Sequence, residues 1–426
     1  MKKLLIKNGT VVDTVNEKII SKDILCEDGV IVNIDDCIDK DVDFDGEVID
    51  ASGKIVAPGL FDVHVHFRDP GLTHKEDIYT GANAAKKGGF TSVVMMANTK
   101  PVNDNPETLK YTLEKGRETG INVYAATCIT KGMQGKELVD MENLKKLGAA
   151  GFTDDGLPIM EEKVVLEAMT KANELGVALS FHEEDPALID NNGVNRGAAS
   201  THYGIGGSPR EAEITMIERD LNLAVKTGAI VNIQHISTKE GVQLVQEAKN
   251  KSSNIHAEAT PHHFTLTEEA TIKYGTNAKM NPPLRTEEDR RAIVEGLRDG
   301  VIDIIATDHA PHSKEEKDKE ITNAPSGIIG LETALSLAIT TLVHKEKLPL
   351  ARVIKAMTLA PASMYGIEAG KIEKGEKADF CIFDENKTTK YDSFESKASN
   401  TPFIGMELDG KICYTICNGE IVYSAN

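Results

Sequence analysis

The sequence lacks any long uninterrupted apolar segment. Of its 426 residues, 40% are hydrophobic, which is ample for a buried core, but no apolar run reaches the length of a membrane-spanning helix. The first residues also lack the apolar stretch and the small-residue cleavage site of a signal peptide. We therefore expect a cytoplasmic protein that does not bind a membrane.

Positive charge is scarce. Lysine and arginine together number 48 against 67 aspartates and glutamates, which gives a formal net charge of −19. Such an acidic chain repels the phosphates of nucleic acids and of anionic lipids, so neither is expected as a partner. A negatively charged small substrate would need a local cationic site.

Two further signatures are missing. The six cysteines are scattered along the chain, as is typical of reduced thiols in a cytoplasmic protein rather than of a disulfide framework. No GxGxxG motif follows the first strand of the central region, which argues against a dinucleotide-binding open sheet.

The central part of the chain alternates between apolar runs and helical stretches. We predict strands at 61–66, 91–97, 121–127, 150–154, 177–182, 230–235, 255–260 and 303–307. Helical stretches such as 161–175 and 209–226 lie between them. Eight strands, each followed by a helix or a long loop, predict an α/β fold of the (β/α)8 TIM-barrel type. A doubly wound open sheet is the alternative.

Both ends of the chain are rich in predicted strands. Asn8-Gly9, Asp28-Gly29 and Asn418-Gly419 stand between apolar stretches and predict hairpin turns. The simplest architecture joins the two ends in one small β-sandwich beside the barrel. The predicted boundaries are 1–55 and 367–426 for the sandwich and 56–366 for the barrel.

Polar residues gather at the strand ends, where a TIM barrel keeps its active site. In the first central strand, FDVHVHFR, residues Asp62, His64, His66 and Arg68 share one face. Two histidines two positions apart on one face can reach the same metal ion, although such a pair also arises by chance.

Other strand ends supply further candidate ligands. These are Asp154 and Asp155 after the fourth strand, His182 after the fifth, His235 after the sixth, and Asp308, His309 and His312 after the eighth. Each histidine taken alone fits an ordinary core residue equally well. Imidazoles and carboxylates together suit zinc and other first-row divalent ions. The set exceeds what one four-coordinate metal needs, so it favours two metals that share a bridging carboxylate.

The motifs HVHFRDPG, MANTKP, FTDDG, FHEED, QHIS, TPHH, NPPLR and ATDHAPH occur in the order and spacing of the dihydroorotase family. The chain resembles this family over nearly its whole length. The resemblance is to the bacterial monofunctional type within the amidohydrolase superfamily. It implies a TIM barrel, a composite end domain and two zinc ions per chain.

The resemblance also assigns the metal ligands. They would be His64, His66 and Asp308 for one ion and His182 and His235 for the other, with Asp155 as the bridge. Many relatives bridge with a carboxylated lysine, but this strand end has Asp154 and Asp155 and no lysine. Neighbouring side chains point to opposite sides of a strand, so we expect Asp155, beside the small Thr153, to face the metals.

Substrate contacts follow from the same resemblance. They map to His66, Arg68, Asn98, Asn281 and His312, and to the backbone of Ser326 and Gly327. Two positions depart from the family pattern: Asp69 stands where glutamate is commoner, and Ser326 stands where a larger residue such as phenylalanine is commoner. The charged segment 313–325 is either a solvated surface loop or a lid over the substrate.

The implied reaction is the reversible interconversion of N-carbamoyl-L-aspartate and L-dihydroorotate, a step of pyrimidine biosynthesis. A metal-bound hydroxide would attack the cyclic amide, with Asp308 as general acid and base. The alternatives are an allantoinase or hydantoinase, and a non-catalytic homologue that acts as a scaffold. A homodimer and an association with aspartate transcarbamoylase are partner hypotheses that the sequence leaves open.

Overall fold

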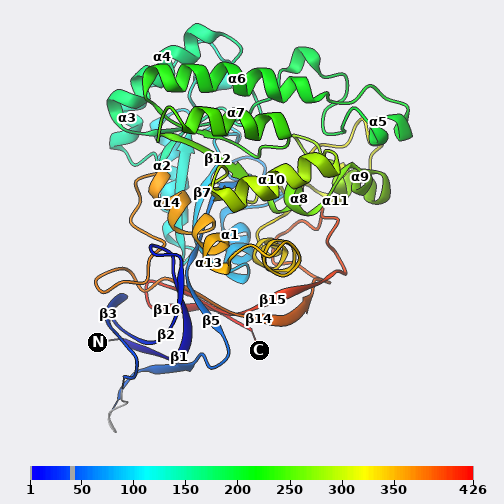
Figure 1. Ribbon diagram of the computed structural model, residues 1–426. Coiled ribbons are helices and arrows are strands. Elements are labelled where there is room, and N and C mark those ends of the chain that lie inside the picture. Colours follow the sequence, from blue (N-terminus) through cyan, green and yellow to red (C-terminus); the bar gives the residue numbers. More distant parts are fainter. Residues whose placement is uncertain (1, 39–43, 426) are drawn as a thin grey trace.

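Eight parallel strands form the central sheet of the protein, here a computed structural model that describes residues 2–38 and 44–425 (Figure 1). The strands are β6 (Leu60–Val65), β7 (Phe90–Met95), β8 (Asn122–Thr127), β9 (Gly151–Thr153), β10 (Ala178–Phe181), β11 (Ile230–Ile233), β12 (Ile255–Ala259) and β13 (Ile304–Ile305). Each strand pairs with the next one in sequence order. A parallel bridge between Val65 and His309 joins the last strand to the first. The predicted TIM barrel is therefore confirmed.

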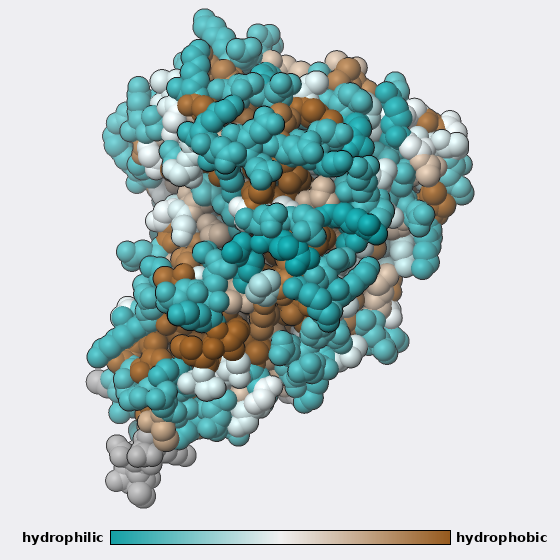
Figure 2. All heavy atoms as spheres, in the orientation of Figure 1, coloured by the Kyte–Doolittle hydropathy of each residue, from teal (hydrophilic) through white to brown (hydrophobic). Residues whose placement is uncertain are grey.

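Helices surround this barrel. They are α1 (Ile78–Lys87), α2 (Pro106–Arg117), α3 (Met141–Lys146), α4 (Glu162–Leu175), α5 (Ala198–Tyr203), α6 (Arg210–Thr227), α7 (Lys239–Lys249), α8 (Pro261–Thr265), α9 (Glu268–Tyr274), α10 (Glu287–Asp299), α11 (Lys314–Lys317), α12 (Ala334–Leu337), α13 (Leu350–Ala356) and α14 (Leu359–Met364). In α4 the buried residues Val165, Ala168, Met169 and Ala172 recur every three to four positions, as expected for a helix that packs one face on the barrel. Figure 2 shows the complementary outer faces, which are mainly hydrophilic over the upper helices. Within the described ranges, no helix has the length and apolar character needed to span a membrane.

The two chain ends build a second sheet of eight strands below the barrel in Figure 1. Its strands are β1 (Lys3–Asp13), β2 (Lys18–Glu27), β3 (Val30–Asp35), β4 (Glu47–Asp50), β5 (Ile55–Pro58), β14 (Phe380–Lys390), β15 (Glu407–Cys417) and β16 (Glu420–Ser424). Strand β5 pairs with both β1 and β14, so it joins the two ends of the chain. A bridge between Val30 and Lys377 folds the sheet over its own apolar core. The predicted composite β domain is confirmed, and its exact residue boundaries stay a prediction.

One predicted turn is wrong. Asn8-Gly9 does not form a hairpin, because β1 runs straight through it. Asn8 has a φ of 57°, and the pairing of β1 with β2 shifts register between Ile6 and Gly9. The dipeptide therefore forms a β-bulge, which uses the same left-handed backbone that a tight hairpin would use. The other two predicted turns, at Asp28-Gly29 and Asn418-Gly419, do connect antiparallel strands.

Candidate metal centre and active site

The carboxyl ends of the barrel strands meet at a cavity of about 450 Å³, a volume that suits a small molecule. The cavity contains nearly all the site residues predicted from the sequence. Its lining includes His66, Arg68, Asn98, Asp155, His182, His235, Asn281, Asp308, His312, Ser326 and Gly327. His64 is the exception, and it lies behind them against Asp155 and Asp308.

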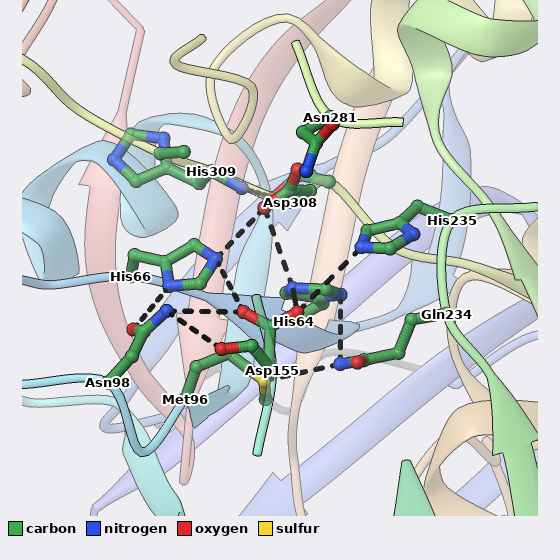
Figure 3. A network of polar contacts seen from close by, with 12 residues as sticks. His64, His66, Met96, Asn98, Asp155, Gln234, His235, Asn281, Asp308 and His309 are labelled. Atoms are coloured by element: carbon green, nitrogen blue, oxygen red, sulfur yellow. Dashed lines mark hydrogen bonds and ion pairs between the residues drawn. The ribbon is translucent and has the colours of Figure 1, made fainter. Parts of the chain in front are cut away.

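The two histidines of the first strand reach the same carboxylates (Figure 3). His66 Nε2 lies 2.9 Å from Asp308 Oδ1 and 3.4 Å from Asp155 Oδ2. His64 Nε2 lies 3.4 Å from Asp155 Oδ1 and 3.5 Å from Asp308 Oδ1. On its other nitrogen, His66 contacts Asn98 Oδ1 at 2.9 Å. Two positions apart on one strand, the imidazoles thus converge as the alternation predicts.

Asp155 stands between two groups of candidate ligands. The first group is His64 and His66, and the second is His182 and His235; Asp155 belongs to both, and in each group the ligand atoms are within 4.8 Å of one another. His182 Nδ1 is 3.9 Å and His235 Nε2 is 3.7 Å from Asp155 Oδ1. A carboxylate shared by two groups of nitrogen donors is the arrangement expected for a bridged pair of divalent cations.

The neighbouring Asp154 points elsewhere. Its carboxylate accepts hydrogen bonds from the backbone N–H of Ile129 at 2.8 Å and of Thr130 at 3.1 Å, and from the Thr130 hydroxyl. It therefore ties the end of β9 to the loop after β8. The two adjacent aspartates have separate partners, and Asp155 is the one inside the cluster.

Charge in the cluster is set by a competition. Burial opposes ionisation of every member, but the carboxylates of Asp155, Glu258 and Asp308 raise the pKa of His64 well above its usual value. Burial is likewise outweighed by the charges of the nearby histidines, which hold the pKa values of Asp155 and Asp308 below their usual range. Asp155 and Asp308 are thus ionised, and His64 holds a second ring proton that a bound cation would displace.

Three site residues have a left-handed backbone. The φ angles are 58° at Arg68, 34° at His235 and 49° at Asp308, a conformation that costs a residue other than glycine about 1–3 kcal/mol. At His235 the turn breaks strand alternation. Gln234 and His235, although adjacent, both reach the cluster (Figure 3). The three strained residues thus all line the cavity, and at His235 the strained turn brings two adjacent polar side chains to the cluster.

Arg68 supplies the cationic side of the cavity. Its Nε donates to the Pro311 carbonyl at 3.2 Å, and its Nη2 lies 3.4 Å from His312 Nε2. That nitrogen of His312 is also 2.9 Å from the Ser326 carbonyl. Opposite them, Asn281 Nδ2 lies 3.4 Å from His182 Nε2. A planar guanidinium beside amide and backbone groups is suited to a carboxylate ligand.

The segment 313–325, predicted to be either a loop or a lid, forms part of the cavity wall through Thr322, Ala324 and Pro325. Two buried lysines hold it. Lys279 Nζ donates to the carbonyls of Ile321 and Ala324, each at 2.7 Å. Lys317 Nζ donates to those of Pro325 and Gly327, each at 2.9 Å.

Sequence reasoning missed these lysines and also Glu258, which contacts His64 Nδ1 at 2.7 Å. A signal for Glu258 was present. It is a charged residue, the fourth of five, in the short strand IHAEA, whose last three residues are fully buried. His309, another histidine named from the sequence as a candidate ligand, does not join the cluster, since its ring contacts Glu76 and the backbone of Gly330.

Comparison with known proteins identifies the family. A model of dihydro-orotase-like proteins matches residues 53–241, and a model of the amidohydrolase family matches residues 297–423. The dihydroorotase of Clostridioides difficile (strain 630) is 55% identical over 422 residues, which are 99% of this chain and 100% of that protein. The chain belongs to the dihydroorotase family. Another dihydroorotase, from Clostridium acetobutylicum, is 53% identical over 99% of both chains. The family predicted from the motifs is confirmed.

Solved structures that carry the names hydantoinase and dihydropyrimidinase share this architecture. The L-hydantoinase (dihydropyrimidinase) from Arthrobacter aurescens matches with a TM-score of 0.88 and 26% identity, over 100% of this chain and 96% of that chain. The dihydropyrimidinase from Brevibacillus agri NCHU1002 gives 0.85 and 23%, over 99% and 95%. The barrel and the composite sheet are therefore not particular to dihydroorotases. The similarity in sequence, and not the fold, distinguishes this chain as a dihydroorotase relative.

Proposed function

We propose that this protein is a metal-dependent dihydroorotase, which interconverts N-carbamoyl-L-aspartate and L-dihydroorotate. The observation that carries the proposal is one cavity that combines two histidine groups around Asp155 with a partly buried arginine, Arg68. The histidine groups suit a pair of divalent cations, and the arginine suits a substrate carboxylate. The relatives of this chain carry the name of the same activity.

The proposed metal ligands are four histidines and two aspartates. They are His64, His66 and Asp308 for one cation and His182 and His235 for the other, with Asp155 between them. The donors fit zinc, since imidazole and carboxylate are its common ligands. His64 Nε2 supports the fit, because it is buried and has no hydrogen-bond partner among the described residues. We propose two zinc ions per chain.

The residues of the chain divide the chemistry as follows. When bound, the cations supply Lewis-acid polarisation of the amide carbonyl and lower the pKa of the attacking water. Asp308 accepts the proton of that water and passes it to the leaving amide nitrogen, with the same steps reversed in ring closure. Its lowered pKa keeps it ionised within the cluster. The 2.9 Å contact with His66 Nε2 orients the carboxylate.

Substrate is held on the opposite wall. Arg68 and Asn98 bind the carboxylate outside the reacting ring, and Asn281, His312 and the backbone at Ser326 and Gly327 complete the contacts. Arg68 is well placed because its guanidinium lies in the cavity wall, where its direct contacts are the Pro311 carbonyl and the His312 ring and neither is an anion. Burial itself lowers the pKa of Arg68, but a guanidinium stays charged near neutral pH.

A substrate panel tests the proposal. Zinc-loaded protein is assayed in parallel with N-carbamoyl-L-aspartate, dihydroorotate, hydantoin and allantoin, and its metal content is measured. We expect turnover of the first two only, with two zinc ions per chain. Turnover confined to hydantoin or allantoin would replace the proposed substrate, and bound metal without any turnover would favour a scaffold role.

A further inference from the structure

Glu258 is a buried carboxylate that the proposed reaction does not use. It lies near the end of β12, and no part of its side chain is exposed. Its Oε1 is 2.7 Å from His64 Nδ1, whereas its Oε2 has no hydrogen-bond partner among the described residues. Removing a carboxylate from water is unfavourable unless its contacts compensate. The contact with His64 is therefore the interaction that offsets the cost of burying this carboxylate.

This contact determines which nitrogen of His64 carries a proton. An ionised carboxylate only accepts hydrogen bonds, so the proton between the two groups belongs to Nδ1. Nε2 is then the nitrogen whose lone pair a cation can bind, once the cation displaces the second ring proton. It faces Asp155 Oδ1 at 3.4 Å and Asp308 Oδ1 at 3.5 Å, on the side of the candidate metal ligands (Figure 3).

One competing contact exists on the same nitrogen. Gln234 Nε2 lies 3.4 Å from His64 Nδ1 and could donate there only if Nδ1 carried no proton. The Glu258 contact is shorter by 0.7 Å, the difference between 3.4 and 2.7 Å. A short contact to a charged acceptor is much the stronger of the two. The geometry therefore favours the Nδ1–H form of His64.

We propose that Glu258 is a positioning residue that holds His64 in the form whose Nε2 can bind a divalent cation. The inference rests on the metal site of the proposed function. Glu258 acts through His64 in two ways: it fixes the ring and its proton, and its negative charge makes Nε2 a better donor. A carboxylate behind a ligating histidine is worth about 10- to 100-fold in metal affinity.

The first experiment compares zinc affinity in matched variants. Glu258→Gln keeps the size and an acceptor oxygen but removes the charge. Zinc dissociation constants are measured by competition with a chromophoric chelator. We expect one of two bound ions to be held 10- to 100-fold more weakly. The control is Glu332→Gln, which alters another buried carboxylate whose Oε1 accepts from the backbone of Glu395. Its zinc affinity should equal that of the wild type.

The second experiment needs no variant. In zinc-loaded wild-type protein, ¹⁵N NMR of the imidazoles should show the His64 proton on Nδ1 and none on Nε2. If that proton is on Nε2, or if Glu258→Gln binds both ions as tightly as the wild type, the inference is overturned. If the wild type binds no zinc at all, the proposed function fails instead, so the two failures are distinguishable.

Discussion

Asp154 and Asp155 are neighbours in the chain, yet their carboxylates serve different parts of the protein. Asp155 faces four imidazoles, and Asp154 accepts hydrogen bonds from the loop after β8. The difference follows from their order after the end of β9, since adjacent side chains leave a strand on opposite sides. The same substitution at the two positions therefore has different consequences.

Alanine at each aspartate tests this division. Asp155→Ala removes the carboxylate that the two histidine groups share, so it should abolish activity and release at least one metal ion. Asp154→Ala should keep both metals but lose stability, at about 1–3 kcal/mol for each buried donor left without an acceptor. Zinc content and thermal unfolding of both variants provide the measurement. The assignment is reversed if Asp154→Ala is the variant that empties the site.

Arg68 carries the proposed recognition of the substrate carboxylate. Arg68→Ala should lower kcat/KM for dihydroorotate by the equivalent of about 2–5 kcal/mol, because a buried charge-assisted contact is lost. Metal content should not change, since Arg68 is not a ligand. Arg196→Ala is a suitable control, because that side chain is 47% exposed and pairs with Asp190 at the surface. Equal kcat/KM in Arg68→Ala and the wild type would show that Arg68 does not bind the substrate carboxylate.

Among the elements, the segment from Ser313 to Gly327 links the surface to the cavity. Lys317, at the end of α11, donates into the end of this segment, and Lys279 donates into its middle. Both lysines are 4% exposed. A backbone carbonyl that accepts a hydrogen bond from a buried ammonium is held in one orientation. The cavity wall at Gly327 therefore depends on Lys317, ten positions earlier in the chain.

Lys317→Met should loosen this wall. Methionine fills similar space but donates no hydrogen bond, so the carbonyls of Pro325 and Gly327 lose a buried donor. We expect a raised KM with a smaller change in kcat, and a loss of stability of about 1–3 kcal/mol. Steady-state kinetics and thermal unfolding measure both effects. The exposed Lys319 provides the control Lys319→Met, and identical KM values in the two variants would contradict the role given to Lys317.

The order of the elements could be predicted from the sequence with little error. Each predicted barrel strand coincides with an observed one, because buried parallel strands appear as short apolar runs between helical patterns. Asn8-Gly9 shows the limit of local signals, since a bulge and a hairpin use the same left-handed backbone. Which one forms depends on β2, the partner strand, and not on the dipeptide.

The candidate site was predictable where its residues stand at strand ends or match family motifs. Glu258, Lys279 and Lys317 are different. Glu258 joins β12 to β6, Lys279 joins the loop before Asn281 to the segment after α11, and Lys317 joins the end of that segment back to α11. A pattern within one strand or loop does not encode a distance to another, so these roles emerged only from the structure.

At the scale of the whole molecule, the cluster joins strands from all around the barrel. The ligands that we propose lie at the carboxyl ends of β6, β9, β10, β11 and β13, so bound cations would cross-link these strands. Without cations, Asp155, Glu258 and Asp308 crowd negative charge around His64. Metal binding and folding stability are therefore coupled.

Metal removal should lower the melting temperature. Ligand that binds only the folded state stabilises it by about 2.7 kcal/mol at 100 times its Kd, which corresponds to a shift of several degrees for a large domain. Differential scanning calorimetry before chelation, after chelation and after zinc is restored measures the shift. Asp155→Ala is the control and should respond little to the chelator. Equal melting temperatures of the wild type with and without zinc would contradict this coupling.

The closure of the barrel has a consequence for how the protein is made. Asp62, beside the first histidine, accepts a hydrogen bond from Thr307, a residue 245 positions later. A ribosome adds about 5–20 residues per second, so the first strand waits on the order of 10–50 s for its last neighbour to be synthesised. During that interval the nascent chain has an incomplete sheet with an open edge. The proposed ligand set is therefore incomplete until Asp308, 244 residues after His64, has been synthesised.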